Sequence, residues 1–153
     1  MAGLSHDFLL VARKEHEYSE YMNFINAPSA IQINDDLLGY MADTLKWIPT
    51  YNPAKAEKSE GLCWCGPTVI KSEGAKVTAR IFRAWAELLS CGPKRLRLTG
   101  SWGVKEGNPV AEGEYEKIKL DRDEAVIMIT ALATLADRVA ESKDELYILH
   151  LGI

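Results

Sequence analysis

The chain has 153 residues, of which 47% are hydrophobic and 26% are charged, and its net charge is −4. These values are typical of one globular domain with a hydrophobic core, and they exclude a disordered, collagen-like or disulfide-scaffold protein. No apolar run approaches the roughly 20 residues of a membrane span, and the N-terminus lacks the basic start and the cleavage site of a signal peptide. We therefore expect a single domain over residues 1–153, located in the cytoplasm, with no membrane partner.

The negative charge is concentrated at the start of the chain. Residues 1–60 contain nine acidic and five basic side chains, whereas residues 61–153 contain 13 of each sign. A polar, turn-rich stretch begins at Pro49, and we interpret it as a loop between two layers of one domain. The overall acidic balance argues against a dedicated nucleic-acid-binding protein.

The acidic part is predicted to be mainly helical. A strand over residues 7–11 precedes a helix near 13–25, and a second short strand covers 30–33. A helix over 35–48 follows. Asn34 precedes this helix as an N-cap, a position at which the side chain accepts a backbone N–H.

Residues 61–153 show a clearer alternation of strands and helices. Strands are predicted over 62–70, 95–99, 115–120 and 145–151, and helices over 73–90 and 121–141. The resulting order β-α-β-β-α-β is that of ferredoxin-like folds, in which two helices cover one face of an antiparallel sheet. We therefore expect an α+β domain whose second half is ferredoxin-like, with the acidic, mainly helical residues 1–60 packed on it.

One side of the predicted helix over 35–48 carries a stripe of acidic and aromatic side chains. At about 100° per residue, the apolar residues of this helix fall on one core face: Leu37, Leu38, Met41, Leu45 and Ile48. Away from that face lie four residues that we call the acidic-aromatic stripe: Asp36, Tyr40, Asp43 and Trp47. Tyr51, just after the helix, extends the stripe in this interpretation.

Exposed tryptophan and tyrosine side chains are typical of binding hot spots, and carboxylates beside them select a basic partner. The stripe and Tyr51 are therefore the predicted partner-binding residues. The alternative is that Tyr40 and Trp47 pack beneath a neighbouring element, which would leave the carboxylates as an ordinary solvated surface.

No catalytic signature occurs in the sequence. The three histidines show no metal-ligand spacing, and no P-loop, G-x-G-x-x-G or G-x-S-x-G motif is present. An odd count of three cysteines suggests free thiols, and we interpret Cys63 and Cys65 as buried structural groups on one face of a strand. We expect no catalytic residue, metal or cofactor. A small enzyme or ligand-binding domain that uses Cys63, Cys65 or His150 remains an alternative.

A basic surface is predicted in the second half. If the strands over 95–99 and 115–120 form a hairpin, one face carries four cations and an aromatic ring: Arg95, Arg97, Lys117, Lys119 and Tyr115. Such a face suits single-stranded RNA. However, Glu114 and Glu116 flank the cations, and ordinary solvated charges on a hairpin explain the pattern better. We therefore do not expect a nucleic-acid partner, and a weak RNA-binding sheet stays an alternative.

The acidic-aromatic stripe, the missing active site and the compact second half, from Gly61-Leu-Cys-Trp-Cys-Gly66 to Tyr147-Ile-Leu-His-Leu-Gly-Ile153, carry a resemblance. The chain resembles small intracellular immunity proteins of bacterial polymorphic-toxin and contact-dependent inhibition systems. This resemblance implies a non-enzymatic protein that neutralises a basic, nuclease-like toxin domain. It transfers no functional residue to this chain, and the same surface is also suited to a homodimer.

Overall fold

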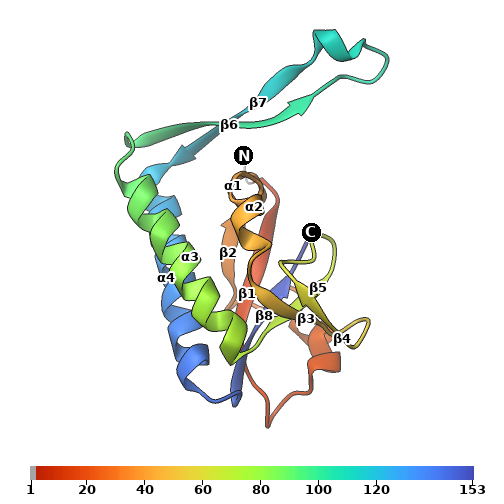
Figure 1. Cartoon of the computed structure of the whole chain (residues 1–153), viewed down its shortest axis with the longest axis vertical. Coiled ribbons are helices and arrows are strands. Elements are labelled where there is room, and N and C mark those ends of the chain that lie inside the picture. The colour runs from red at the N-terminus through yellow and green to blue at the C-terminus, as the bar shows by residue number, and fades with distance from the viewer. Residues whose placement is uncertain (1–2) are drawn as a thin grey trace.

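Six strands form one antiparallel sheet in the computed structural model, which describes residues 3–153. The strand order is β2-β1-β8-β5-β3-β4 (Figure 1). The strands are β1 (Ser5–Ala12), β2 (Ile31–Asn34), β3 (Pro49–Asn52), β4 (Glu57–Glu60), β5 (Pro67–Ile70) and β8 (Leu146–Leu151). Leu149 of β8 lies opposite Leu9 of β1 on one side and Val69 of β5 on the other. All three residues are buried, which places β8 in the interior of the sheet.

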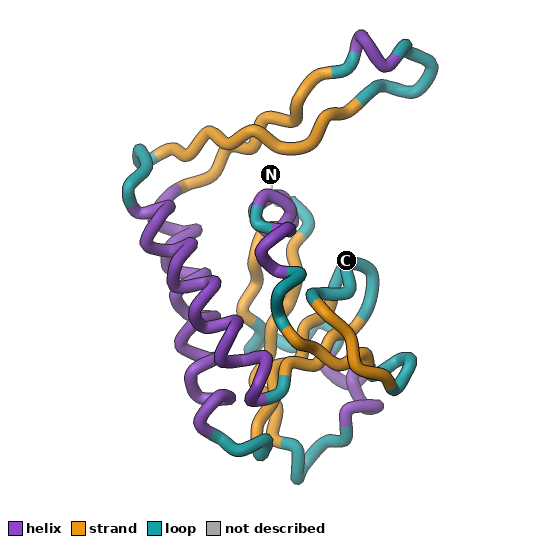
Figure 2. Tube along the Cα trace, in the orientation of Figure 1, coloured by secondary structure: helices purple, strands orange, loops and turns teal. Residues whose placement is uncertain are grey.

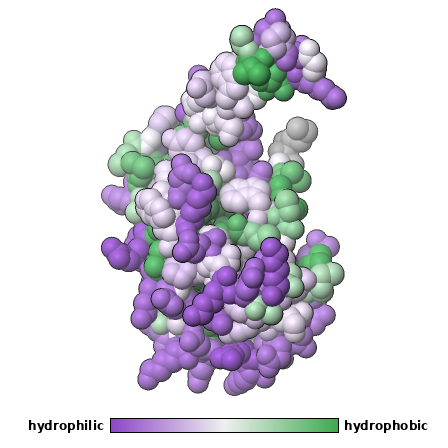
Figure 3. Space-filling model, turned by 45° about the vertical axis from the view of Figure 1, so that its right-hand side comes forward, coloured by the Kyte–Doolittle hydropathy of each residue, from purple (hydrophilic) through white to green (hydrophobic). Residues whose placement is uncertain are grey.

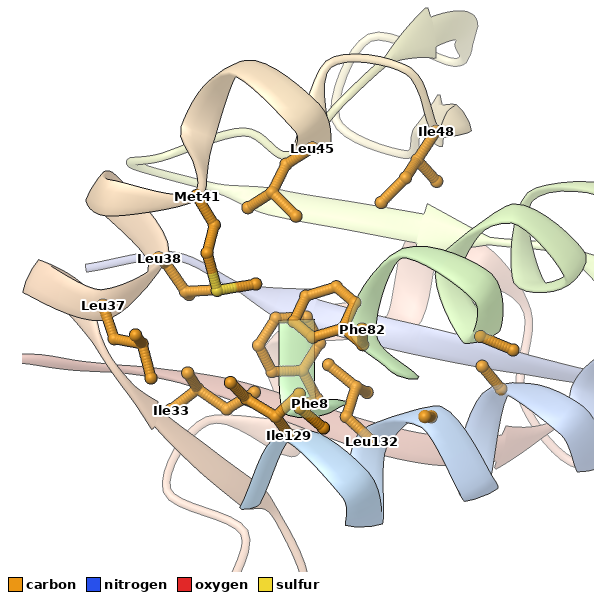
Figure 4. Close-up of a cluster of buried hydrophobic side chains, with 14 of the residues drawn as sticks. Phe8, Ile33, Leu37, Leu38, Met41, Leu45, Ile48, Phe82, Ile129 and Leu132 are labelled. Atoms are coloured by element: carbon orange, nitrogen blue, oxygen red, sulfur yellow. The ribbon is translucent and has the colours of Figure 1, made fainter. Parts of the chain in front are cut away.

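Two long helices, α3 (Ser72–Ser90) and α4 (Arg122–Glu141), pack side by side against one face of the sheet (Figure 2). Two short helices, α1 (Asp35–Tyr40) and α2 (Ala42–Leu45), complete this layer. Phe8 of the sheet, Phe82 of α3 and Leu132 of α4 point toward one another in the core (Figure 4). Burying side chains of this size stabilises the fold by about 1.5–3 kcal/mol each.

A 3₁₀ helix, η1 (Tyr18–Phe24), lies against the opposite face of the sheet. Tyr18, Tyr21 and Phe24 recur every third residue, the period of a 3₁₀ helix, and all three pack on the second apolar cluster of the sheet. That cluster includes Tyr147, whose ring centre lies 4.9 Å from the ring centre of Tyr18. Burial raises the pKa of the Tyr147 phenol to about 12.

Two further strands, β6 (Arg95–Gly103) and β7 (Glu114–Asp121), pair only with each other and form a hairpin that projects beyond the helices (Figure 1). We call residues 95–121 the arm. Its outer turn includes a short 3₁₀ helix, η2 (Val110–Glu112). Leu96 and Ile118 near the base of the arm are buried, whereas residues 101–112 are exposed. The arm is therefore anchored at its base and free at its tip.

The mixed α+β class and the order of elements in the second half are confirmed, but the ferredoxin-like arrangement is not found. A ferredoxin-like sheet would include β6 and β7, yet β3 occupies the second edge of β5 instead. The physical reason lies in β6, which carries Leu96 and Leu98 near its start and then turns polar and glycine-rich. Only the base of this hairpin has apolar surface to bury against the domain.

The acidic part is not mainly helical, because residues 1–60 contribute four strands of the large sheet. Between Arg13 and Ile25 the only helix is the 3₁₀ helix η1. The stretch beginning at Pro49 forms the β3–β4 hairpin rather than an irregular loop. Pairing with neighbouring strands thus satisfies the backbone hydrogen bonds of segments whose side-chain pattern alone favoured helix or loop.

The single helix predicted over 35–48 is instead two short helices, α1 and α2, which meet at Met41 and end at Leu45. The Asn34 side chain accepts the backbone N–H of Leu37 at 3.2 Å, so the predicted N-cap is confirmed. The predicted core face is also confirmed, because all five of its residues are buried: Leu37, Leu38, Met41, Leu45 and Ile48.

Candidate functional site

All four residues of the acidic-aromatic stripe lie at the surface. Tyr40 is 41% exposed and Trp47 is 67% exposed, and the carboxylates of Asp36 and Asp43 face solvent. The alternative in which the two aromatic side chains pack inside the domain is therefore not what the structure contains. Both rings keep enough free surface to contact another molecule.

The stripe divides between two hollows of the surface. Asp36 and Tyr40 line a groove between α1 and the arm. Trp47 lies instead beside the outer face of α3, in a shallow depression that includes Val77 and Ile81. Asp43 lies between these positions on α2, and its carboxylate is 3.0 Å from the Lys46 ammonium group.

Tyr51 is separate from the stripe, because its side chain belongs to the opposite layer of the sheet. Its ring centre lies 5.5 Å from the ring of Tyr18, and the Lys71 ammonium group lies 4.5 Å above the ring of Tyr51. Tyr51 makes this cation–π contact and packs on the apolar cluster around Tyr147, so it contributes to the structure of this layer. The structure therefore does not bring Tyr51 together with Asp36 and Tyr40.

The groove between α1 and the arm, which we call the acidic groove, has a volume of about 570 Å³. Its carboxylates come from segments about 80 residues apart: Asp35 and Asp36 begin α1, and Glu116 lies on β7. The rings of Tyr40 and Trp64 also line it, and its described lining contains no lysine or arginine. Gly100 on β6 makes room for Glu116, because a Cβ atom there would lie 2.8 Å from a Glu116 carboxylate oxygen. The groove therefore presents negative charge and aromatic surface together.

Asp35, at the edge of the groove, is held by a buried hydrogen-bond network. His6 Nε2 and Trp64 Nε1 each lie 2.8 Å from the same carboxylate oxygen, Asp35 Oδ1. Behind them, His6 Nδ1 lies 2.8 Å from His150 Nε2, and His150 Nδ1 lies 3.3 Å from Thr68 Oγ1. Both imidazole rings are fully buried, whereas the Asp35 side chain is 25% exposed.

One arrangement of protons satisfies every bond of this network with both imidazoles neutral. The Thr68 hydroxyl accepts the backbone N–H of Cys63 at 2.8 Å and donates its own proton to His150 Nδ1. His150 Nε2–H then donates to His6, whose Nε2–H donates to the Asp35 carboxylate. Burial, reinforced by the neighbouring His6, lowers the pKa of His150 to about 3, so this imidazole is neutral at physiological pH.

The network fixes the direction of the Asp35 carboxylate, since two donors hold one of its oxygens. The sequence interpretation missed it because His6 and His150 are 144 residues apart and meet only through the pairing of β1 with β8. The sequence contains a partial signal: His6 and the buried Phe8 are two residues apart on one strand, so both side chains are expected to point into the core.

The cysteines do not form a buried pair. Residues 62–66 form a loop rather than the start of a strand, and in this loop Cys63 is half-buried while Cys65 is exposed. The interpretation of both thiols as buried structural groups is therefore wrong. Within residues 3–153, no group of three or more potential metal ligands is present. His150 is fully buried and bonded to His6 and Thr68.

In the part of the chain that the structure describes, no helix combines the length and the apolar character needed to cross a membrane. Comparisons of the chain with protein-family models, with curated proteins and with solved structures gave no match. The chemistry of the acidic groove and of the stripe around it is therefore the basis for assigning a function.

Proposed function

We propose that this protein is a non-enzymatic binding protein whose acidic groove receives a basic side chain of a protein partner. The observation that carries the proposal is the convergence of Asp35, Asp36 and Glu116 on one groove. Neither Asp36 nor Glu116 forms an ion pair within residues 3–153. Unpaired carboxylates gathered in this way attract a cation, and a guanidinium group fits them with paired hydrogen bonds.

The aromatic walls of the groove strengthen the same preference. Tyr40 and Trp64 line the groove beside the carboxylates, and a cation over such a ring gains about 0.5–2 kcal/mol. Asp35 is already oriented by His6 and Trp64, so binding would cost little additional side-chain entropy at this position. A pre-ordered acceptor next to aromatic surface is a suitable receptor for a lysine or arginine side chain.

Trp47 and Asp43 would extend the contact beyond the groove. Trp47 offers a large exposed ring beside the apolar side chains of α3, which is the chemistry of an interface hot spot. Asp43 adds charge at the rim of this surface and would mainly increase the rate of encounter with a basic partner. The binding surface would therefore run along α1 and α2, with the acidic groove at one end.

In its narrower form, the proposal is that the partner is a basic, nuclease-like toxin domain and that the chain acts as an immunity protein. The resemblance described above and the concentration of the whole net charge in residues 1–60 support this form. An inhibitor of a nucleic-acid-cleaving domain gains affinity by offering carboxylates in place of phosphates.

The test combines capture of a partner with charge-neutral variants of the groove. The double variant Asp36→Asn/Glu116→Gln removes two negative charges from the groove, and Glu57→Gln/Glu60→Gln removes two from the exposed strand β4 as a matched control. We expect a basic protein captured from the native cell to bind the control normally and the groove variant at least about tenfold more weakly. Equal binding by all forms would contradict the proposal.

The narrower form has its own measurement. The captured protein is expressed alone and together with this chain, and we expect growth arrest in the first case and rescue in the second. Sedimentation of the purified protein tests the remaining alternative, because a homodimer disrupted by Trp47→Ala would assign the stripe to self-association instead.

A further inference from the structure

The face of the arm that points away from the acidic groove carries a row of cations. Residues directly opposite each other in an antiparallel pair project on the same side, and Arg97 lies opposite Lys119, while Thr99 lies opposite Lys117. Arg97, Lys117 and Lys119 are all exposed. Like charges placed opposite each other destabilise a ribbon, so the pairing of Arg97 with Lys119 does not contribute to the stability of the arm.

The neighbouring glutamates do not neutralise this row. Glu114 and Glu116 are one position out of phase with Lys117 and Lys119 along β7, so they belong to the opposite side of the ribbon. Glu116 lines the acidic groove on that side. Within residues 3–153, Arg97, Lys117 and Lys119 form no ion pair. The side chains of the flanking acids that argued against a basic surface in the sequence thus project from the opposite side of β7.

A bulge adds two aromatic rings to the same face. Two residues, Gly100 and Ser101, lie between Thr99 and Trp102 on β6, but only Glu116 lies between their partners Lys117 and Tyr115 on β7. Because of this extra residue, Trp102 projects on the same side as Arg97 and Lys117. In a regular strand it would project on the opposite side. The rings of Trp102 and Tyr115 are 5.0 Å apart at 76°, and they are 46% and 56% exposed.

Gly113 supports the position of the Trp102 ring. A Cβ atom on Gly113 would lie 2.6 Å from the indole nitrogen, so the ring lies directly against the backbone of the facing strand. Figure 3 shows the outer part of the arm standing clear of the body, with hydrophobic side chains gathered near its end. We call five residues on this side, which also carries Arg95 and Thr99, the outer face of the arm: Arg97, Trp102, Tyr115, Lys117 and Lys119.

We propose that the outer face of the arm binds single-stranded nucleic acid. The row of Arg97, Lys117 and Lys119 matches the charge of a phosphate backbone, and the rings of Trp102 and Tyr115 are placed to stack on bases. A single strand is the ligand because its bases are free to stack on exposed rings, whereas the bases of a duplex are already stacked. This activity is independent of the proposed function, which uses the other side of the arm.

The test uses fluorescein-labelled oligo(U) and oligo(dT) ten-mers with the full-length protein, measured by fluorescence anisotropy at low salt. We expect saturable binding with a log–log salt slope of about −2, because each of three phosphate contacts contributes about −0.7 on a single strand. The triple variant Arg97→Ala/Lys117→Ala/Lys119→Ala should bind at least about tenfold more weakly. The triple variant Lys55→Ala/Lys58→Ala/Lys76→Ala removes three exposed cations elsewhere and should bind as the wild type does.

The four tryptophans separate this proposal from the proposed function. Trp102 is on the arm, Trp64 lines the acidic groove, Trp47 is in the stripe, and the Trp85 indole is bonded to Thr44. Indole N–H signals of the labelled protein should show the oligonucleotide moving Trp102 and leaving Trp64 and Trp47 in place. The groove variant Asp36→Asn/Glu116→Gln should retain oligonucleotide binding, and Trp102→Ala should weaken it about fivefold or more.

Several outcomes would overturn the proposal. These are no binding at 50 mM salt, equal loss of binding in the two triple variants, and equally tight binding of a DNA duplex. A fourth is binding of a polyglutamate peptide with the affinity of the oligonucleotide, since this would reduce the outer face to a general attractor of negative charge. Retention of the wild-type Trp64 signal in the triple variants and in Trp102→Ala shows that the fold is intact.

Discussion

A comparison of β8, at the centre of the sheet, with β6 and β7 of the arm shows how the side-chain pattern determines whether a strand is buried. β8 is apolar at both parities and is buried between two layers, with β1 and β5 as its neighbours. β6 and β7 are apolar on one side only near their base, and there they rest on the helices. Beyond the base both sides are polar or aromatic, so the ribbon leaves the domain and offers each face to a different environment.

Phe82→Ala should have the largest effect on stability, because it leaves a cavity in the hydrophobic core between the helices and the sheet. The arm has no such core. Phe82 is fully buried and its ring centre lies 6.4 Å from that of Phe8. We expect a loss of about 3–5 kcal/mol in the free energy of unfolding, measured by urea denaturation. Ile127→Ala, which truncates an exposed side chain of α4, is the matched control and should change stability little.

Acid should weaken the body through His150. Because burial lowers the pKa of this imidazole to about 3, the unfolded chain binds the proton more readily than the folded one. The stability is fully present above about pH 6.5 and is lost as the pH falls toward 3. Between pH 7.5 and 4.5 we expect a loss of about 3 kcal/mol from this group.

Urea denaturation across this pH range, with His150→Gln as the comparison, measures the effect. Glutamine stays neutral, so the variant should lose less of its stability on acidification than the wild type. Parallel pH profiles for the two proteins would mean that other groups dominate the acid response.

Ile118→Ala should have a smaller effect, confined to the place where the arm joins the helices. Ile118 is buried at the arm base and packs beside Leu98 and Leu120. We expect a loss of about 2 kcal/mol, the lower end for such a truncation. Amide exchange of the arm should accelerate more than that of β1 and β8. Equal acceleration in both would show that the arm and the sheet unfold as one unit.

Trp102→Ala should have the smallest effect on stability, because the outer part of the arm contributes little to the core. Trp102 contacts Tyr115 and the backbone at Gly113 but keeps nearly half of its surface exposed. We expect a change within about 0.5 kcal/mol in urea denaturation. A loss greater than 1.5 kcal/mol would show that the aromatic pair is a structural element rather than a surface for ligands.

Part of the candidate site was predictable from local pattern alone. The helical spacing of residues 35–48 separated the buried core face from the exposed Asp36, Tyr40, Asp43 and Trp47. The alternation in the two hairpin strands correctly placed Arg97 and Lys119 on one face and Leu96 and Ile118 on the other. These features depend only on which side of an element a residue occupies.

Other parts of the site depended on distant segments. The acidic groove exists because β7 brings Glu116 to the start of α1, about 80 residues earlier in the chain. Asp35 is held by His6, which is itself bonded to His150 across the whole length of the chain. The side of Trp102 was hidden for a different reason, since it depends on a bulge that simple alternation does not reveal.

The sequence by itself therefore determined the order of elements in the second half, the helix start at Asp35 and the inward faces of these elements, because helical and strand periodicity and the Asn34 cap act within a few residues. Only the tertiary structure decided which strands became neighbours, since each edge joins the partner that completes its backbone hydrogen bonds and buries its apolar face. The acidic groove and the outer face of the arm follow from that choice.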